Sequence, residues 1–224
     1  MVVRASCGSG LGFGSQHSQT LENWVAATPG LKVVQPSDAQ SAYSLLRASI
    51  QDNNPVMFLE PRILYAERGE VDTSLKMEIG KARILQEGSE ATVVSLGNMV
   101  NVAREAIKES GLSVELIDLA TLVPWDRQTV ITSVTKTGRL IVVEESPWSG
   151  GWGSEIVSYV ASHAFSALKS APFRITAPDV PVPYSGTLEA RYVPTATNVA
   201  LALKEAVKEN KVPQPWWITE GVSK

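Results

Sequence analysis

Short apolar runs rich in valine and isoleucine alternate along this chain with longer stretches of helical period, and this alternation constrains the fold more than any other feature. The apolar runs, each with the length and composition of a buried strand, begin at residues 31, 54, 91, 113, 138 and 173. The helical stretches cover residues 37–51, 98–110, 126–136, 152–169 and 195–209. Strands that alternate with helices form parallel sheet through right-handed crossovers, so the sequence predicts an α/β fold.

Residues 62–90 interrupt this alternation with a charged, loop-rich segment, and we place a domain boundary near residue 85. The segment before the boundary holds two clear predicted strands, and the segment after it holds about four. A two-stranded parallel unit is a poor independent domain, because parallel strands need cover on both faces and neighbours at both edges. We therefore expect the N-terminal segment to be the second half of something larger.

Several helix ends carry recognisable signals. Ser37 followed by Gln40 predicts a capping box at the start of the helix over 37–51. Gly111 and Gly138 follow the next two helices and are expected to end them in the left-handed conformation. Lys136 lies near the negative end of the second of these helices.

Composition excludes several classes of function. The chain has 20 Lys and Arg against 23 Asp and Glu, scattered along the sequence, which predicts no nucleic-acid-binding or anionic-membrane-binding surface. Its apolar runs are far shorter than the roughly 20 residues that span a bilayer. The single cysteine, Cys7, cannot form an internal disulfide, and an incidental thiol in a reducing compartment is the default interpretation.

A glycine run, "CGSGLGFGSQHSQ", follows a short apolar stretch and precedes a helical one. This order is typical of a dinucleotide-binding loop, but the glycines at 8, 10, 12 and 14 give G-x-G-x-G instead of G-x-G-x-x-G, and the expected ribose-binding acid is absent. A P-loop is excluded because no G-K-[ST] follows. A nucleotide-binding Rossmann protein is therefore a weak rival hypothesis.

The two histidines have different contexts. His17 follows the glycine run, where close backbone approach to a ligand is possible, so a catalytic imidazole and a capping or core histidine are about equally plausible. His163 lies among apolar positions of a predicted helix, which favours a structural role.

Two further stretches have a functional alternative to an ordinary structural role. The turn "SIQDNNP" reads first as Asx and proline turn chemistry, but Asp52 and Asn54 beside helix-end carbonyls could also bind a monovalent cation. In "ESPWSGGWGSE", which joins a strand end to a helix, Trp148 and Trp152 favour a subunit interface over a ligand site.

Taken together, the motifs resemble one known family. In order, they are "QHSQTLENW", "PGLKVVQPSDAQSAYSLLRASIQDNNPVMFLEPRILY", "IGKARILQEGS", "VELIDLATLVPWD", "KTGRLIVVEES", "GGWGSEI" and "APDVPVPY". Over residues 2–208 the chain resembles the transketolase-like beta subunit of the decarboxylating first component of 2-oxo acid dehydrogenase complexes.

The resemblance implies a domain organisation. Residues 1–85 would form the C-terminal half of a pyrimidine-binding thiamine diphosphate domain plus a linker, and residues 86–210 a transketolase C-terminal-type α/β domain. Residues 211–224 form an extra tail, whose prolines and tryptophans could dock on a partner.

The resemblance also implies a function and partners. The enzyme would decarboxylate pyruvate or a branched-chain 2-oxo acid oxidatively and transfer the acyl group to a lipoyl domain. An alpha subunit would hold the diphosphate of thiamine diphosphate and its magnesium ion, in a heterotetramer with a second beta subunit that serves a lipoyl acyltransferase component. Such an enzyme would be cytoplasmic in a bacterium or archaeon, and in the mitochondrial matrix or a plastid in a eukaryote.

Site residues carry over by position. His17 matches the family histidine that reaches the cofactor and substrate, where it would transfer a proton or orient the acyl acceptor. The turn matches the family's potassium site, so Ser49 and Ile50 would offer carbonyl oxygens and Asp52 and Asn54 further oxygens.

The chain also departs from the family pattern. Members carry an upstream segment with the glutamate that protonates the cofactor's pyrimidine nitrogen, so we expect this chain to be N-terminally truncated relative to them. The alternative is a non-catalytic assembly module of the same fold that lacks this glutamate. The identity of the 2-oxo acid stays open.

Overall fold

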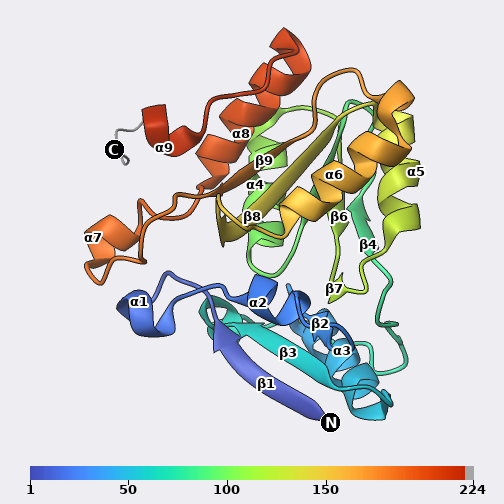
Figure 1. The fold of residues 1–224 in the computed structure, drawn as a ribbon, viewed down its shortest axis with the longest axis vertical. Coiled ribbons are helices and arrows are strands. Elements are labelled where there is room, and N and C mark those ends of the chain that lie inside the picture. The colour runs from blue at the N-terminus through green and yellow to red at the C-terminus, as the bar shows by residue number, and fades with distance from the viewer. Residues whose placement is uncertain (220–224) are drawn as a thin grey trace.

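The computed structural model describes residues 1–219, which form two sheets stacked along the long axis of the molecule (Figure 1). We call them the N-terminal sheet, with strand order β1-β3-β2-β7, and the C-terminal sheet, with strand order β4-β6-β5-β8-β9. This arrangement confirms the predicted α/β fold.

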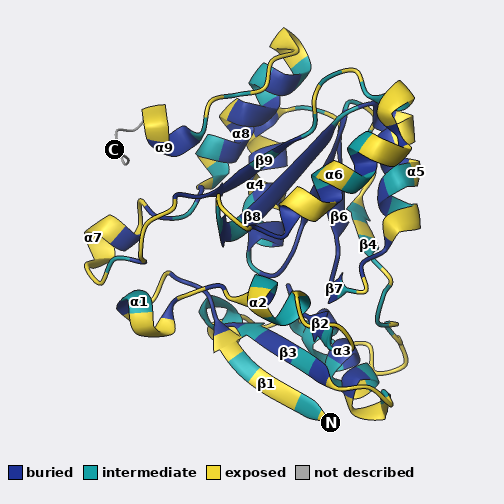
Figure 2. Cartoon of the chain, viewed as in Figure 1, coloured by how far each residue is buried: buried dark blue, intermediate teal, exposed yellow. Residues whose placement is uncertain are grey.

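The N-terminal sheet contains more strands than the apolar runs predict. It consists of β1 (Val2–Cys7), β3 (Val56–Pro61), β2 (Lys32–Val34) and β7 (Thr121–Val123). The first three strands are parallel, and β7 pairs antiparallel with β2. The expectation of two clear strands before residue 85 is therefore wrong. β1 lies at the sheet edge with much of its surface exposed (Figure 2), so its sequence "VVRASC" lacks a continuous apolar pattern.

The parallel strands of the C-terminal sheet are almost entirely buried (Figure 2). Its parallel strands are β6 (Val114–Asp118), β5 (Ala91–Ser95), β8 (Leu140–Pro147) and β9 (Phe173–Ala177). The expected four strands are present, and a fifth, β4 (Arg83–Gln86), adds an antiparallel edge that periodicity did not predict.

Helices cover both faces of the C-terminal sheet, as parallel strands require. One face packs against α4 (Met99–Ser110) and α8 (Ala196–Lys204), and the other against α5 (Arg127–Thr137) and α6 (Gly153–His163). The π-helical turn η3 (Glu205–Glu209) continues α8. The helix expected over 152–169 ends at His163, and the short 3₁₀ turn η2 (Phe165–Ala167) follows it.

The N-terminal sheet is covered by α3 (Ala39–Gln51), whose Leu45 packs on Val34, Val56 and Phe58. Short elements border this sheet: α1 (Gly14–His17), α2 (Glu22–Ala26) and the 3₁₀ turn η1 (Arg62–Ala66). The opposite face of the sheet shares one apolar cluster with the α5–α6 side of the C-terminal sheet. The two sheets therefore pack against a common core.

The capping box of α3 lies one residue later than predicted. Asp38 is the N-cap, and its carboxylate accepts from the Ser41 N–H at 2.7 Å. In return, the Ser41 hydroxyl oxygen accepts from the Asp38 N–H at 3.1 Å. The Ser37 hydroxyl is engaged elsewhere, because it donates to Asp118 Oδ2 at 2.7 Å and its oxygen accepts from the Arg83 guanidinium at 2.9 Å. Gly111 and Gly138 end α4 and α5 at φ +69° and +81°, which confirms their predicted role.

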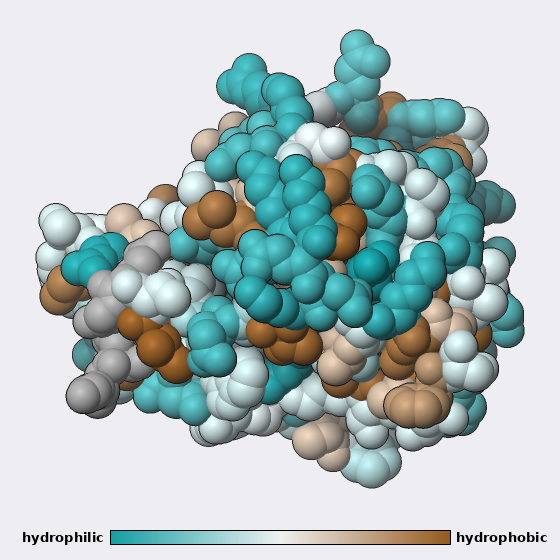
Figure 3. Space-filling model, turned by 90° about the horizontal axis from the view of Figure 1, so that it is seen from above, coloured by the Kyte–Doolittle hydropathy of each residue, from teal (hydrophilic) through white to brown (hydrophobic). Residues whose placement is uncertain are grey.

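Polar side chains occupy most of the end of the molecule shown in Figure 3, with apolar ones in separate patches. Among residues 1–219, no helix combines the length and apolar character needed to cross a membrane.

The last described segment packs on its own chain. In α9 (Trp216–Thr219), Trp216 and Trp217 are both buried and join the apolar cluster under α4 and α8. The Trp216 indole N–H donates to the Thr176 carbonyl at 2.9 Å, and Trp217 meets Trp148 edge to face. The part of the predicted tail beyond residue 219 lies outside the described residues.

Truncation of this anchor tests the packing of the tail. Trp216→Ala should lower the free energy of unfolding by about 3–5 kcal/mol, because it leaves a cavity and an unpaired carbonyl. Ile218→Ala is the matched control, since Ile218 is 53% exposed and its truncation should cost within about 0.5 kcal/mol. Urea denaturation measures both, and equal stabilities of the two variants would contradict the docking.

Candidate functional site

The glycine run lies at the carboxyl edge of the N-terminal sheet, on the side that faces the C-terminal half of the chain (Figure 1). β1 ends at Cys7, and residues 8–13 lead from it into the α1 turn that ends at His17. Ligands of parallel α/β sheets bind outside the carboxyl ends of the strands. This position makes the run and the α1 turn the first candidate for a functional site.

Two glutamates of the C-terminal region hold the run in place. Glu145 Oε1, at the end of β8, accepts from the Ser9 N–H at 2.6 Å and from the Ser9 hydroxyl at 2.7 Å. Glu189, which ends the helical turn α7 (Gly186–Glu189), accepts from the Gly10 N–H at 2.9 Å and from the Gly12 N–H at 2.7 Å. Ion–dipole hydrogen bonds of this kind are stronger than bonds between neutral groups.

The alternating glycines explain how one loop presents several N–H groups. Glycines 8, 10, 12 and 14 all have positive φ, between +63° and +102°, and the residues between them do not. The N–H groups of Gly10 and Gly12 converge on one carboxylate, so the loop forms a concavity of N–H donors of the kind called an anion-binding nest. Side chains would also clash here, since an added Cβ on Gly14 would lie 2.9 Å from the Tyr184 ring.

The nest is already filled by the protein's own carboxylates, which decides what it can bind. A phosphate group needs free N–H donors or basic side chains, whereas here Ser9, Gly10 and Gly12 donate to Glu145 and Glu189. The carboxylates would also repel an anion. The loop therefore fits neither the pyrophosphate of a dinucleotide nor the diphosphate of thiamine diphosphate.

Further buried carboxylates lie around this contact. Glu22 of α2 accepts from the Ser146 hydroxyl at 2.7 Å, and burial raises its pKa. Burial likewise raises the pKa of Glu144 and of Glu145 to about 7. Glu144 is nevertheless paired with Arg174 at 3.0 Å, whereas for Glu145 the neighbouring charges of Glu22 and Glu189 act in the same direction as burial.

His17 lies on the exposed side of this arrangement. It is the last residue of α1, and its side chain faces solvent while Gly14 and Ser18 on either side of the turn are buried. The aromatic ring of Phe13 lies under the Arg62 guanidinium, 4.8 Å from the ring centroid to Cζ. The turn therefore holds the exposed His17 imidazole at the carboxyl edge of the sheet, while its backbone is buried at Gly14 and Ser18.

His163 is exposed at the end of α6 and does not lie in the apolar core. Its ring stacks on Tyr159 with centroids 3.9 Å apart, and Nδ1 lies 2.8 Å from the Tyr159 carbonyl oxygen. These local contacts fit a role at the helix end.

The predicted cation turn lies at the C-terminal end of α3. The Ser49 carbonyl accepts from the Asp52 N–H at 3.3 Å, and the Asp52 carboxylate accepts from the Asn54 N–H at 2.8 Å. The same carboxylate meets the Lys32 ammonium at 2.5 Å, which lowers the pKa of Asp52. Ile50 has an exposed side chain and could contribute its backbone carbonyl alone.

No group of three or more His, Cys, Asp or Glu side chains in residues 1–219 is arranged to hold a metal ion. A monovalent site at the turn would consist of carbonyl and amide oxygens together with the lysine-paired carboxylate.

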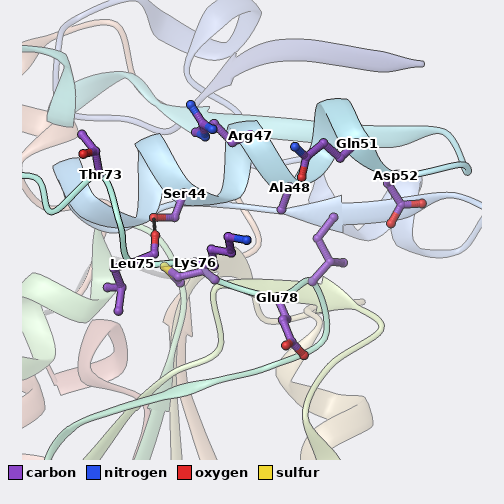
Figure 4. A pocket seen from close by; sticks show the side chains of 11 residues that line it. Ser44, Arg47, Ala48, Gln51, Asp52, Thr73, Leu75, Lys76 and Glu78 are labelled. Carbon is purple, nitrogen blue, oxygen red and sulfur yellow. Dashed lines mark hydrogen bonds between the residues drawn. The ribbon is translucent and has the colours of Figure 1, made fainter.

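A cavity of about 430 Å³ adjoins this turn, between α3 and residues 73–79 (Figure 4). Its charged lining is mixed: Arg47 and Lys76 are basic, and Asp52 and Glu78 are acidic. Neither His17 nor the glycine run lines it.

The two tryptophans that suggested a subunit interface have separate environments. Trp152 is buried in the chain's own core, which corrects its assignment to an interface. Trp148 is 43% exposed, and the Arg174 guanidinium lies over its ring at 4.9 Å.

Sequence reasoning found the loop but missed the glutamates that hold it. "EES" at the end of a predicted strand was a usable signal for Glu145, because carboxylates at strand ends lie near ligand sites. Glu189 lies 177 residues beyond Gly12 in an irregular segment, and no local pattern connects the two.

Comparison with known proteins identifies the family and the fold of this chain. Residues 1–68 match the family described as the transketolase pyrimidine-binding domain, and residues 80–199 match the transketolase C-terminal domain. A solved structure titled "Split gene transketolase, inactive beta4 tetramer" superposes with a TM-score of 0.78 over 94% of this chain and 68% of that one, at 24% identity.

Curated relatives are more similar in sequence. The chain is 40% identical to the pyruvate dehydrogenase E1 component subunit beta-1, mitochondrial, of Arabidopsis thaliana, over 94% of this chain and 60% of the relative. It is also 40% identical to the beta subunit of acetoin:2,6-dichlorophenolindophenol oxidoreductase of Cupriavidus necator, over 94% of this chain and 64% of the relative. The chain thus spans 60% and 64% of the lengths of these relatives.

The buried glutamates predict a pH-dependent stability. Glu145 has a pKa of about 7 in the folded chain, above its value near 4.5 when unfolded. Its stabilising effect is complete below the unfolded pKa and is lost as the pH rises through about 7. The free energy of unfolding should therefore fall by on the order of 1–3 kcal/mol per such group between pH 5 and pH 8.

Urea denaturation of Glu145→Gln at both pH values isolates this contribution. The variant should show a smaller pH dependence than the parent chain, and Glu105→Gln, on the exposed face of α4, should show the parent's dependence. Identical dependence in the parent and Glu145→Gln would contradict the assignment.

Proposed function

The chain belongs to the transketolase family, and we propose that it forms the larger part of the beta subunit of a thiamine diphosphate-dependent 2-oxo acid dehydrogenase. Its substrate would be pyruvate or a branched-chain 2-oxo acid, decarboxylated oxidatively before the acyl group passes to a lipoyl domain. The similarity to the pyruvate dehydrogenase and acetoin oxidoreductase beta subunits supports this class of reaction.

One observation carries the proposal: the imidazole of His17 is displayed at the carboxyl edge of the sheet on a loop whose backbone is fixed by Glu145 and Glu189. An exposed imidazole on a fixed backbone can exchange a proton near neutral pH or donate a hydrogen bond to a substrate oxygen. We propose that His17 serves the reacting group or the incoming lipoyl group in this way.

The residues of this chain constrain where the cofactor would lie. Thiamine diphosphate supplies the nucleophile for 2-oxo acid decarboxylation when it is bound. Its diphosphate does not fit the filled nest, so we assign the diphosphate and its magnesium ion to an alpha subunit. His17 would then face the cofactor across the interface between the two subunits.

The proposed assembly is a heterotetramer of two alpha and two beta subunits that serves a lipoyl acyltransferase component. Within this chain we propose residues 1–85 as the pyrimidine-binding portion with its linker, 86–210 as the C-terminal domain, and 211–224 as the tail. The apolar core shared by the two sheets supports their acting as one rigid support for His17.

A potassium ion is proposed at the turn after α3. Backbone carbonyls of Ser49 and Ile50 and the side-chain oxygens of Asp52 and Asn54 are the candidate ligands. The Asp52 carboxylate, already bonded to the Asn54 N–H and to the Lys32 ammonium, would hold this turn in shape.

A non-catalytic assembly module is the second candidate. It is favoured by the outer edge of β1, which no strand within residues 1–219 pairs, and by the 75% exposure of Trp24. Both features are suited to contact with another chain. Calorimetric titration of thiamine diphosphate into the chain combined with an alpha subunit separates the two: saturable binding with 2-oxo acid turnover refutes the module, and an intact complex that binds no cofactor supports it.

His17→Ala tests the catalytic assignment. In the complex with an alpha subunit, the variant should turn over the 2-oxo acid on the order of 10²–10⁴-fold more slowly, the usual size of general acid–base effects. Its thermal midpoint should match the parent's, because the side chain is exposed. His163→Ala is the matched control and should retain activity. Parent-like turnover by His17→Ala would return His17 to a structural role.

Exchange of sodium for potassium tests the cation site. At constant ionic strength, the thermal midpoint of the chain should be higher in KCl than in NaCl. Binding of potassium at a hundredfold excess over Kd would add about 2.7 kcal/mol to the free energy of unfolding. Asp52→Ala should abolish the difference between the salts, and Glu105→Ala should preserve it. Equal midpoints of the parent chain in both salts would exclude the site.

A further inference from the structure

We infer that Glu189 is a positioning residue for the proposed reaction: its carboxylate fixes the loop that carries His17, and it acts only through that loop. This inference rests on the proposed function, and it adds a residue from the far end of the chain to the site.

The contact has the geometry of a two-point clamp. One oxygen of Glu189 accepts from the Gly10 N–H at 2.9 Å and the other from the Gly12 N–H at 2.7 Å. Because each oxygen takes one donor, the carboxylate fixes both the position and the orientation of the loop, as a single hydrogen bond would not. Gly12 lies five residues before His17, and the α1 turn connects the two.

Glu189 is itself firmly held. Its side chain is 3% exposed, its N–H donates to the Ser185 carbonyl at 2.8 Å, and its carbonyl accepts from Tyr192, which is also buried. Tyr192 packs with Ala177 at the end of β9. The clamp therefore connects the His17 loop to the segment that follows β9, and Figure 1 shows α7 and α1 lying one above the other.

The hydrogen bonds within residues 8–19 do not supply this restraint. The backbone bonds within the segment are local: the Gly8 N–H donates to the Gln19 carbonyl at 3.3 Å, and the Ser18 N–H to the Gly14 carbonyl at 3.1 Å. They close the loop and the turn but do not tie them to the C-terminal half of the chain, and the Phe13 ring meets Arg62, which also belongs to the N-terminal half. Ordering glycine at positions 10 and 12 costs more conformational entropy than ordering other residues, and the two hydrogen bonds to Glu189 offset part of that cost.

Glu145 has a different part in the same contact. It holds Ser9, at the exit from β1, and so sets where the loop begins. Of the N–H groups that these two glutamates hold, Glu189 holds the two that lie nearer to His17 in the chain. Of the two glutamates, Glu189 is therefore the one whose loss should displace the imidazole while the strand end stays in place.

A double-mutant cycle with His17 tests the inference in the complex with an alpha subunit. Glu189→Ala should lower kcat on the order of 10²-fold, the effect of a displacement of about 1 Å at a reacting group, with KM for the 2-oxo acid little changed. In a His17→Ala background the same change should cost less than about twofold, because the group it positions is gone. Glu105→Ala is the control and should leave both constants unchanged.

Glu189→Gln provides a graded variant that preserves the shape of the side chain. Its amide keeps one acceptor oxygen and presents an NH₂ group to the second loop donor. Its kcat should lie between those of the parent and Glu189→Ala. Parent-like kcat in both Glu189 variants, or an undiminished loss in the His17→Ala background, would overturn the inference.

Amide hydrogen exchange in the chain alone gives a readout independent of activity. Exchange at Gly10 and Gly12 should accelerate on the order of tenfold in Glu189→Ala and stay unchanged in His17→Ala. If the parent complex proves inactive, the proposed function fails, and these exchange rates still decide whether Glu189 holds the loop. Unchanged exchange at both glycines in Glu189→Ala would overturn the positioning role.

Discussion

Burial of carboxylates against backbone N–H groups between the two sheets is the interaction on which the rest of this structure depends. A buried charge is costly unless it is paired or hydrogen-bonded. Glu145 and Glu189 meet that cost through the glycine nest, and fully buried Asp118 meets it through Arg83 at 2.6 Å and the Ser37 hydroxyl. The donors Ser9, Gly10 and Gly12 follow β1, whereas Glu145 and Glu189 belong to the C-terminal half, and Asp118 of β6 reaches Ser37 just before α3. These contacts therefore fix how the two halves of the chain are placed relative to each other.

Much of the fold could be predicted from the sequence because apolar runs report burial directly. The runs that form β5, β6 and β8 lie in a sheet covered on both faces. The edge strands β1 and β4 and the three-residue β7 were missed, since an edge strand needs only one apolar face and a very short strand has no measurable period. The capping box of α3 was misplaced because Ser37 has a tertiary partner in Asp118, which outcompetes a local role.

The candidate site could be predicted only in its local part. The sequence shows that a histidine follows alternating glycines. It also shows that the spacing of these glycines differs from that of a dinucleotide-binding loop. What fills the loop is not visible, because Glu189 is one of 23 acidic residues and only tertiary structure brings it to Gly10 and Gly12. The glycines suggested an open cradle for a ligand, and the structure shows a cradle filled from within.

The return of β7 to the N-terminal sheet has a consequence for how this architecture can be rearranged. Thr121–Val123 follow the second strand of the C-terminal sheet's parallel core, yet they complete the sheet of the preceding segment by pairing with β2. Residues 67–82, between η1 and β4, therefore separate the two halves in the sequence but not in the tertiary structure. Recombination of genes at that point would exchange incomplete sheets, so halves of this kind are expected to be inherited together and to diverge as a matched pair.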